Sequence, residues 1–137
     1  EMCGGGLYST AGDYLKFVNR VRIRFKANVN LSLKPETVEL MSKNAMGASK
    51  VVMLKPAIPP LSNDAEFFPG MSKSWGLSFM INDEKAPTGR SAGSLAWAGL
   101  ANTYYWIDQS KGVGGVPDHP GEPAPQGHPR PFRQDRL

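Results

Sequence analysis

One pentapeptide in this chain has the residue types that a serine nucleophile requires. Gly89-Arg90-Ser91-Ala92-Gly93 matches Gly-x-Ser-x-Gly, a pattern that exposes its serine on a sharp turn between a strand and a helix. The chemistry also needs a carboxylate and a later histidine, yet His119 and His128 both lie in a proline-rich tail. A turn-like segment precedes the pentapeptide and a strand-like segment follows it. We therefore expect a glycine-flanked turn, with an esterase that uses Ser91 as an alternative.

Two other segments carry a more extensive pattern. Residues 4–14 read Gly-Gly-Gly-Leu-Tyr-Ser-Thr-Ala-Gly-Asp-Tyr, and residues 94–108 read Ser-Leu-Ala-Trp-Ala-Gly-Leu-Ala-Asn-Thr-Tyr-Tyr-Trp-Ile-Asp. Together they resemble the C-terminal part of the serine hydrolases that share the class C β-lactamase fold, most closely the family VIII carboxylesterases. The resemblance covers residues 3–116. It implies ester hydrolysis through an acyl-enzyme formed on a serine that a lysine activates.

The nucleophile motif of that family is absent from this sequence. The family uses Ser-x-x-Lys, in which the lysine lowers the cost of deprotonating the serine without a histidine. No serine from Ser9 to Ser110 has a lysine three residues later, and no tyrosine begins the second family motif, Tyr-x-Asn. Both motifs normally precede the glycine-rich segment, so the chain is expected to be a catalytically silent fragment of a larger hydrolase.

A third family motif has a counterpart here. Class C β-lactamases place Lys-Thr-Gly on the strand beside the active site, and family VIII esterases commonly have Trp-Gly-Gly there. Trp97-Ala98-Gly99 resembles that triplet. The resemblance assigns Gly99 and Leu100 to a backbone oxyanion hole, with the N–H of Leu100 as the donor, and Trp97 and Ala98 to substrate binding. Because tryptophan cannot pair with a substrate carboxylate as lysine would, neutral esters are favoured over β-lactams.

Each of these residues also has a purely structural interpretation. Trp97 could be a core aromatic, and Gly99 could mark a bulge in a strand. The aromatic residues that could line an acyl pocket are more typical of a core on alternating strands; they are Trp75, Tyr104, Tyr105 and Trp106. Asp83 and Glu84 are expected to be solvated charges in a turn, and Cys3 a small apolar residue.

The N-terminal part predicts two helices. Thr10 and Asp13 form a capping pair for a helix from residue 11 to 26. Its apolar stripe recurs every three or four residues and consists of Tyr14, Phe17, Val18, Val21 and Phe25. The alternation of residues 21–25 leaves a strand as an alternative. Pro35 suits the first turn of a second helix, for which Val38, Leu40 and Met41 are expected to supply the apolar contacts.

The C-terminal part predicts an antiparallel meander after a long loop at residues 48–74. Residues 75–81 alternate between apolar and other side chains, which is typical of a half-buried strand. Further strands are expected at residues 95–97, 102–107 and 112–116, the last two joined by the loop Asp108–Lys111. Helices followed by a run of antiparallel strands indicate an α+β fold, here a partial transpeptidase-like one.

Composition sets further bounds. The 137 residues, 40% hydrophobic and 20% charged, fit one globular domain, which we place at residues 1–116. No apolar run approaches the roughly 20 residues of a membrane span, and the single cysteine excludes an internal disulfide. Residues 117–137 are rich in proline and poor in apolar side chains, so we expect a disordered tail.

These observations also limit partners and cofactors. The net charge of +4 comes partly from a cluster at residues 20–26 that would form a solvated helix end, so no nucleic-acid or membrane partner is expected. Neither a cofactor nor a metal is expected, and the compartment stays open. The alternative to a hydrolase fragment is a non-catalytic remnant that self-associates or binds a partner through a sheet edge exposed where Pro117 ends the last strand.

Overall fold

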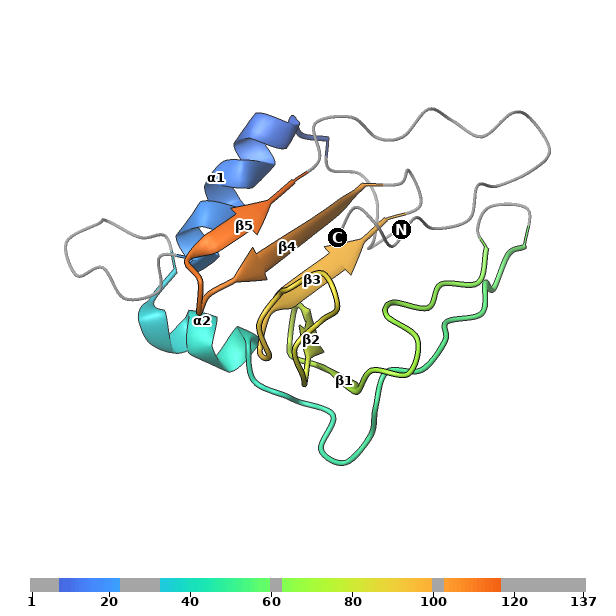
Figure 1. Ribbon diagram of the computed structural model, residues 1–137. Coiled ribbons are helices and arrows are strands. Elements are labelled where there is room, and N and C mark those ends of the chain that lie inside the picture. The colour runs from blue at the N-terminus through green and yellow to red at the C-terminus, as the bar shows by residue number, and fades with distance from the viewer. Residues whose placement is uncertain (1–7, 23–32, 60–62, 100–102, 117–137) are drawn as a thin grey trace.

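The computed structural model describes residues 8–22, 33–59, 63–99 and 103–116. These residues form two helices and an antiparallel sheet, in the α+β arrangement that the sequence predicts (Figure 1). The helices are α1 (Ala11–Arg22) and α2 (Pro35–Met41). The strands are β1 (Lys73–Trp75), β2 (Met80–Asn82), β3 (Leu95–Ala98), β4 (Tyr104–Asp108) and β5 (Val113–Gly115).

Helix α1 begins where the capping pair predicts. The hydroxyl oxygen of Thr10 accepts the backbone N–H of Asp13 at 3.1 Å, and the hydroxyl donates to the Asp13 carboxylate. Val18 and Val21 are fully buried against β4 and β5. Val21 and Arg22 are helical, so a strand beginning at Val21 is wrong, and the expected extension to residue 26 lies outside the described residues.

Helix α2 has Pro35 at its first turn, as predicted. It buries Val38, whereas the side chain of Leu40 is 58% exposed, so the prediction that Leu40 packs inward is wrong. A short helix against a sheet can bury only one narrow stripe, and Leu40 lies on the opposite side of it from the buried valine. The helix ends at Met41, and the hydroxyl of the capping residue Ser42 donates back to the Val38 carbonyl at 2.7 Å.

The sheet is a simple meander in the order β1-β2-β3-β4-β5, with every neighbouring pair antiparallel. The expected strands at residues 95–97, 102–107 and 112–116 correspond to β3, β4 and β5. The long irregular segment before them contains one isolated bridge, between Leu54 and Ala65, and its last residues belong to β1 rather than to a loop. In Figure 1 this segment runs along the β1 side of the sheet, away from α1.

The predicted single strand at residues 75–81 is wrong, because the segment folds into a hairpin of β1 and β2. The N–H of Gly76 donates to the carbonyl of Phe79 at 2.8 Å and closes the turn. Leu77, expected in the core, is 60% exposed on that turn. A Cβ at Gly76 would overlap the carbonyl oxygen of Met41. The turn between β1 and β2 therefore packs directly against the end of α2, and only glycine fits at position 76.

Two apolar clusters cover the two faces of the sheet. Successive strand residues point to opposite faces, and Met80 and Ile81 accordingly belong to different clusters. The first cluster lies under the helices and contains Val18, Val21, Val38, Phe79, Ile81, Leu95 and Ile107. The second lies on the other face under residues 65–71 and contains Phe67, Phe68, Met80, Ala86, Ala96 and Tyr104.

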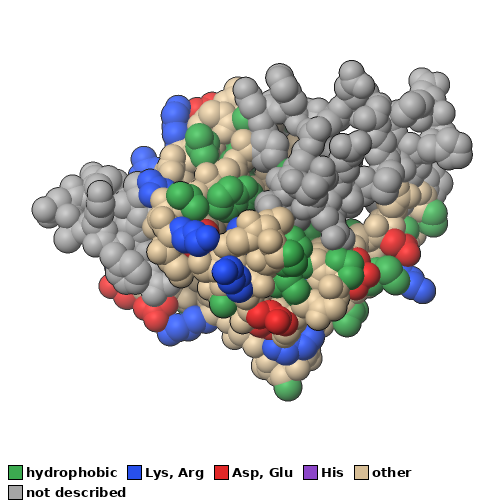
Figure 2. Space-filling model, viewed as in Figure 1, with side chains coloured by type: hydrophobic (Ala, Val, Ile, Leu, Met, Phe, Trp, Pro, Cys, Tyr) green, Lys and Arg blue, Asp and Glu red, His purple; other side chains and the backbone are tan. Residues whose placement is uncertain are grey.

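The surface carries charges of both signs. On the face in Figure 2, Lys and Arg side chains and Asp and Glu side chains are both visible, among tan and green atoms. Of the basic cluster at residues 20–26, Arg22 lies on the last turn of α1 and donates to the carbonyl of Gly112 at 2.7 Å. No helix among the described residues is long and apolar enough to cross a bilayer. The proline-rich residues 117–137 lie outside the described part of the chain.

Candidate functional site

The triplet Trp97-Ala98-Gly99 lies at the end of β3. Trp97 and Ala98 are its last two residues, and Gly99 follows, exposed to solvent. The N–H of Gly99 donates to the carbonyl of Thr103 at 2.7 Å, so the pairing with β4 continues one residue beyond the strand. A Cβ at Gly99 would lie 2.9 Å from the hydroxyl oxygen of Thr103. The position therefore favours a residue without a side chain.

On its other side, β3 extends beyond its neighbour. The pairing of β2 with β3 ends at Met80 and Ala96. In an antiparallel ladder, alternate residues direct their N–H groups to opposite edges. Since the N–H of Gly99 is donated to β4, the N–H of Ala98 faces the β2 side, where no described strand continues. This open edge is the kind of backbone site to which a carbonyl group can hydrogen-bond.

The two residues that the resemblance assigns to the oxyanion hole, Gly99 and Leu100, differ in what the structure says of them. Leu100, whose N–H the resemblance assigns as the donor, lies outside the described residues. Gly99 cannot be that donor, because its N–H is engaged with Thr103. Its contribution is the absence of a side chain beside the edge.

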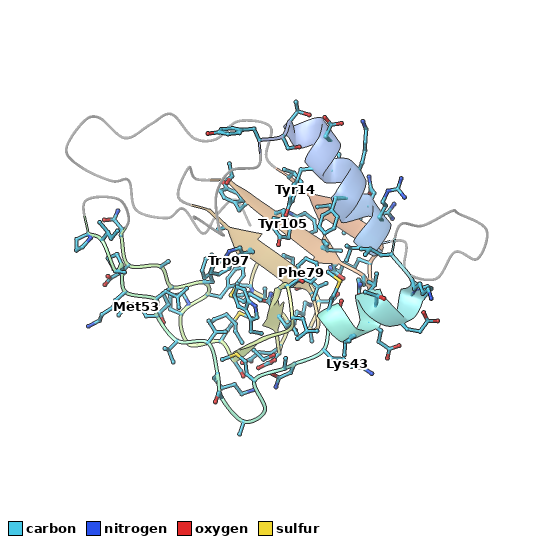
Figure 3. All side chains as sticks on the ribbon, turned by 180° about the vertical axis from the view of Figure 1, so that it is seen from behind. Tyr14, Lys43, Met53, Phe79, Trp97 and Tyr105 are labelled. Atoms are coloured by element: carbon cyan, nitrogen blue, oxygen red, sulfur yellow. The ribbon has the colours of Figure 1, made fainter. Side chains whose placement is uncertain are left out.

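Trp97 packs against aromatic residues from two other segments. Its ring meets that of Trp75 edge to face, with centroids 4.4 Å apart, and lies 5.7 Å from that of Phe67. By alternation Trp97 would share the helix-side face with Tyr105, its partner across the strands. Its ring instead packs with the second cluster, past the end of β2 (Figure 3). Trp97 and Trp75 both remain partly exposed.

The remaining aromatic residues of β4 pack within the two cores. Tyr105 contacts Phe79 and Tyr14 on the helix side, and burial, together with the hydrogen-bonded Tyr14 hydroxyl, raises its pKa above the ordinary range. Tyr104 is buried in the second cluster, and the Trp106 ring packs against that cluster. Of the four aromatic residues considered for an acyl pocket, only Trp75 lies beside Trp97 as a ring partner.

Ser91 lies in a turn between β2 and β3. Gly89 and Gly93 on either side both have positive φ angles, 91° and 79°, which favour glycine. The backbone N–H of Ser91 donates to the carboxylate of Asp108 at 2.8 Å. A strand follows the turn rather than a helix, and the described part of the chain contains no histidine. The geometry of a nucleophile elbow is therefore missing from this turn.

Asp108 organises that turn. Its side chain is 1% exposed and accepts the backbone N–H of Lys111 at 3.0 Å as well as that of Ser91. Desolvation raises the pKa of Asp108, but these hydrogen bonds outweigh it, so the pKa lies below its usual value. The guanidinium of Arg90 is also buried, and desolvation lowers its pKa to about 10, opposed by the charge of Asp108.

Two charged residues near β1 each have several polar partners. Asp83, expected to be a solvated charge, accepts the hydroxyls of Ser74 at 2.6 Å and Ser72 at 2.7 Å and pairs with Lys50 at 2.7 Å. Lys73 is 4% exposed, and its ammonium donates to the carbonyls of Phe68 and Met71. Sequence patterns give no sign of either set of contacts, because most of the partners lie in the irregular segment before β1.

No group of three or more His, Cys, Asp or Glu side chains among the described residues is arranged to hold a metal ion.

The comparison with protein families agrees with this architecture. The family model described as Beta-lactamase matches residues 3–116. A search of curated proteins found no match.

Proposed function

The chain belongs to the β-lactamase family, and from that membership we propose that it forms the sheet-bearing portion of a serine hydrolase that cleaves neutral carboxylic esters. The observation that carries the proposal is the open edge of β3 at Ala98, directly before the exposed Gly99. A fixed N–H at such an edge stabilises the negative charge that develops on a carbonyl oxygen during acyl transfer. In this proposal the N–H of Leu100 is the donor.

The nucleophile and its base are supplied from outside these 137 residues. The sequence contains neither Ser-x-x-Lys nor Tyr-x-Asn. The turn at Ser91 has the carboxylate of Asp108 beside it, but no histidine among the described residues and no helix directly after it. Large apolar side chains are exposed along residues 46–58, with Val52 71% and Ile58 56% exposed. Such surface is typical of an interface with further protein, which supports a contribution from another part of the enzyme.

Preference for an uncharged ester follows from Trp97. A lysine at this position would attract a substrate carboxylate, whereas an indole ring offers apolar contact and one N–H donor. Trp97 is fixed beside two further aromatic rings. The family VIII carboxylesterases, which the triplet resembles, provide the model for this specificity.

The test is hydrolysis of p-nitrophenyl butyrate. The 137-residue chain and its Ser91→Ala variant are both expected to show no turnover. The chain fused behind the Ser-x-x-Lys-bearing portion of a family VIII esterase is expected to gain activity. In that fusion, Leu100→Pro removes the N–H donor and is expected to lower kcat by about 10²–10³, while Leu100→Ala retains it. Turnover by the chain alone that Ser91→Ala abolishes would reject the proposal.

A second candidate function is self-association through a sheet edge. Strand β5 lies at one end of the sheet, and the side chain of Val113 on it is 45% exposed. An unpaired edge strand can pair with a second chain. Sedimentation velocity over a range of concentrations should then show a dimer that Val113→Lys weakens. A monomer at every concentration would dismiss this candidate.

A further inference from the structure

Three aromatic residues from separate parts of the chain converge at the end of β3. Phe67 comes from the irregular segment before β1, Trp75 from β1 and Trp97 from β3. Their ring centroids lie 4.4 Å apart for Trp75 and Trp97, and 5.7 Å apart for Phe67 and Trp97. We call these three residues the aromatic cluster. Edge-to-face and tilted ring contacts favour one relative orientation of the rings, so Phe67 and Trp75 restrict the orientation of Trp97.

The segment that carries Phe67 is itself anchored to β1. The buried ammonium of Lys73 donates to the carbonyls of Phe68 at 3.0 Å and Met71 at 2.7 Å. Phe68 has a positive φ of 50°, which a residue with a bulky side chain rarely adopts. Charge-assisted hydrogen bonds of this kind hold an otherwise unfavourable turn. Because Lys73 and Trp75 share one short strand, both ring partners of Trp97 have a common support.

The cluster borders the open edge of β3. Trp97 is partly exposed and directly precedes Ala98, whose N–H faces that edge, and the exposed Gly99. Among the described residues, the rings that contact Trp97 are those of the other two members of the cluster. A group bound along the edge would therefore meet a flat apolar surface beside a backbone donor, and no charged side chain belongs to the cluster.

Building on the proposed function, we propose that the aromatic cluster binds a flat, uncharged group of the ester, with Trp97 in contact and Phe67 and Trp75 as positioning residues. Lys73 is also a positioning residue, because its hydrogen bonds hold the segment that carries Phe67. The preferred substrates are then aryl or similarly planar neutral esters rather than charged ones.

The test uses the full chain labelled with 5-fluorotryptophan at its three tryptophans, each resonance being assigned with a single Trp→Phe variant. The probes are acetanilide, a neutral aryl amide that mimics an aryl ester, and 4-acetamidobenzoate, the same molecule with a carboxylate. Acetanilide is expected to shift the fluorine resonance of Trp97 but not that of Trp106, and 4-acetamidobenzoate is expected to bind more weakly. Equal shifts at Trp106, or no shift at Trp97 up to the solubility of acetanilide, would overturn the inference. Equal affinity for the two probes would overturn the neutral-group preference.

Variants separate positioning from general stability. Phe67→Leu and Trp75→Leu are expected to weaken acetanilide binding by about three- to tenfold and to move the Trp97 resonance in the free protein. Lys73→Met is expected to move the same resonance, and Lys73→Arg to restore it. Tyr14→Phe, which removes a hydroxyl on the opposite face of the sheet, is the matched control and should leave acetanilide binding unchanged. If Tyr14→Phe weakens binding as much as Phe67→Leu, the positioning role is wrong.

Failure of this inference can be told apart from failure of the proposed function. Hydrolysis by the fusion protein with no response of Trp97 to acetanilide would reject the cluster as a binding surface and retain the hydrolase. A response of Trp97 to acetanilide with no hydrolysis by the fusion would reject the hydrolase and retain the binding surface.

Discussion

Replacing Asp108 with asparagine should destabilise the chain strongly, although the change removes no atoms from the core. The carboxylate is 1% exposed and accepts the backbone N–H groups of Ser91 at 2.8 Å and Lys111 at 3.0 Å, one on each oxygen. An amide at this position keeps one acceptor and turns an NH₂ group toward the other N–H. Two donors then face each other, and the Asp108→Asn variant also loses the negative charge near the buried guanidinium of Arg90.

The magnitude follows from these two contacts. A hydrogen-bonding group left unsatisfied costs about 1–3 kcal/mol, and the surviving bond weakens by roughly 1 kcal/mol because its acceptor is no longer charged. The expected loss in the free energy of unfolding is therefore about 2–4 kcal/mol. Domains of this size are stable by only about 5–15 kcal/mol, so the loss should be visible as a fall in Tm on the order of 10 °C.

The assay is urea unfolding at pH 7 followed by tryptophan fluorescence. Asp64→Asn is the matched control, because Asp64 is exposed and surface substitutions usually change stability by less than about 0.5 kcal/mol. If Asp108→Asn changes the free energy of unfolding by no more than Asp64→Asn does, the reasoning about this turn is refuted.

The stability contributed by Asp108 should also depend on pH. In the folded chain the pKa of Asp108 lies below its ordinary value of about 3.9, so on acidification the unfolded chain takes up a proton before the folded chain does. Stability is then fully present above about pH 4 and decreases as the pH falls through the folded pKa. Unfolding curves of the wild type should show this decrease, and those of Asp108→Asn should show less of it. Parallel pH profiles for the two proteins would contradict the assignment.

Three further predictions concern backbone geometry and can be checked by the same urea unfolding assay. Gly76→Ala should cost about 2–3 kcal/mol or more, because the added Cβ would overlap the carbonyl oxygen of Met41 at the end of α2; a neutral result would mean that the turn does not approach the helix. Gly12→Ala should instead stabilise by up to about 1 kcal/mol, since Gly12 lies in α1 and its Cβ would meet only the Thr10 hydroxyl at 3.8 Å; destabilisation would speak against the helix start. Thr10→Ala should cost about 1 kcal/mol through loss of the cap, whereas Thr10→Ser should not; equal losses in both variants would rule out capping by the hydroxyl.

The elements with local signals could be predicted from the sequence. Helix α1 has its capping pair at Thr10, helix α2 has Pro35 in its first turn, and the short loop Asp108–Lys111 joins β4 to β5. Each of these signals acts within a few residues, which is the range that a sequence pattern reports.

The hairpin of β1 and β2 could not be predicted in this way. The alternation of Trp75, Leu77, Phe79 and Ile81 continues through the turn, so the pattern carries no sign of a break. The break depends on the approach of Gly76 to Met41, residues 35 positions apart in the sequence. Contacts over such separations depend on the tertiary structure and override local preference.

The candidate site likewise has one part that the sequence locates and another that depends on tertiary contacts. The triplet Trp97-Ala98-Gly99 was located from the sequence by resemblance, and the structure places it at the end of β3. The aromatic partner Phe67 lies in an irregular segment with no periodicity, and the buried Lys73 of β1 hydrogen-bonds to that segment. A sequence pattern therefore reports neither. The open edge depends on where β2 stops pairing with β3, which no property of β3 itself reveals.

The meander also has a consequence for the order of folding. Every strand pairs with its neighbour in sequence, so the sheet can form through local contacts, which are the fastest to close. Helix α1 reaches β4 and β5 only across a long stretch of chain, as the hydrogen bond from Arg22 to Gly112, 90 positions apart, illustrates. We expect α1 to dock after the rate-limiting step. Stopped-flow kinetics should then show that Val18→Ala speeds unfolding and leaves the folding rate nearly unchanged; a slowed folding rate would place α1 in the nucleus.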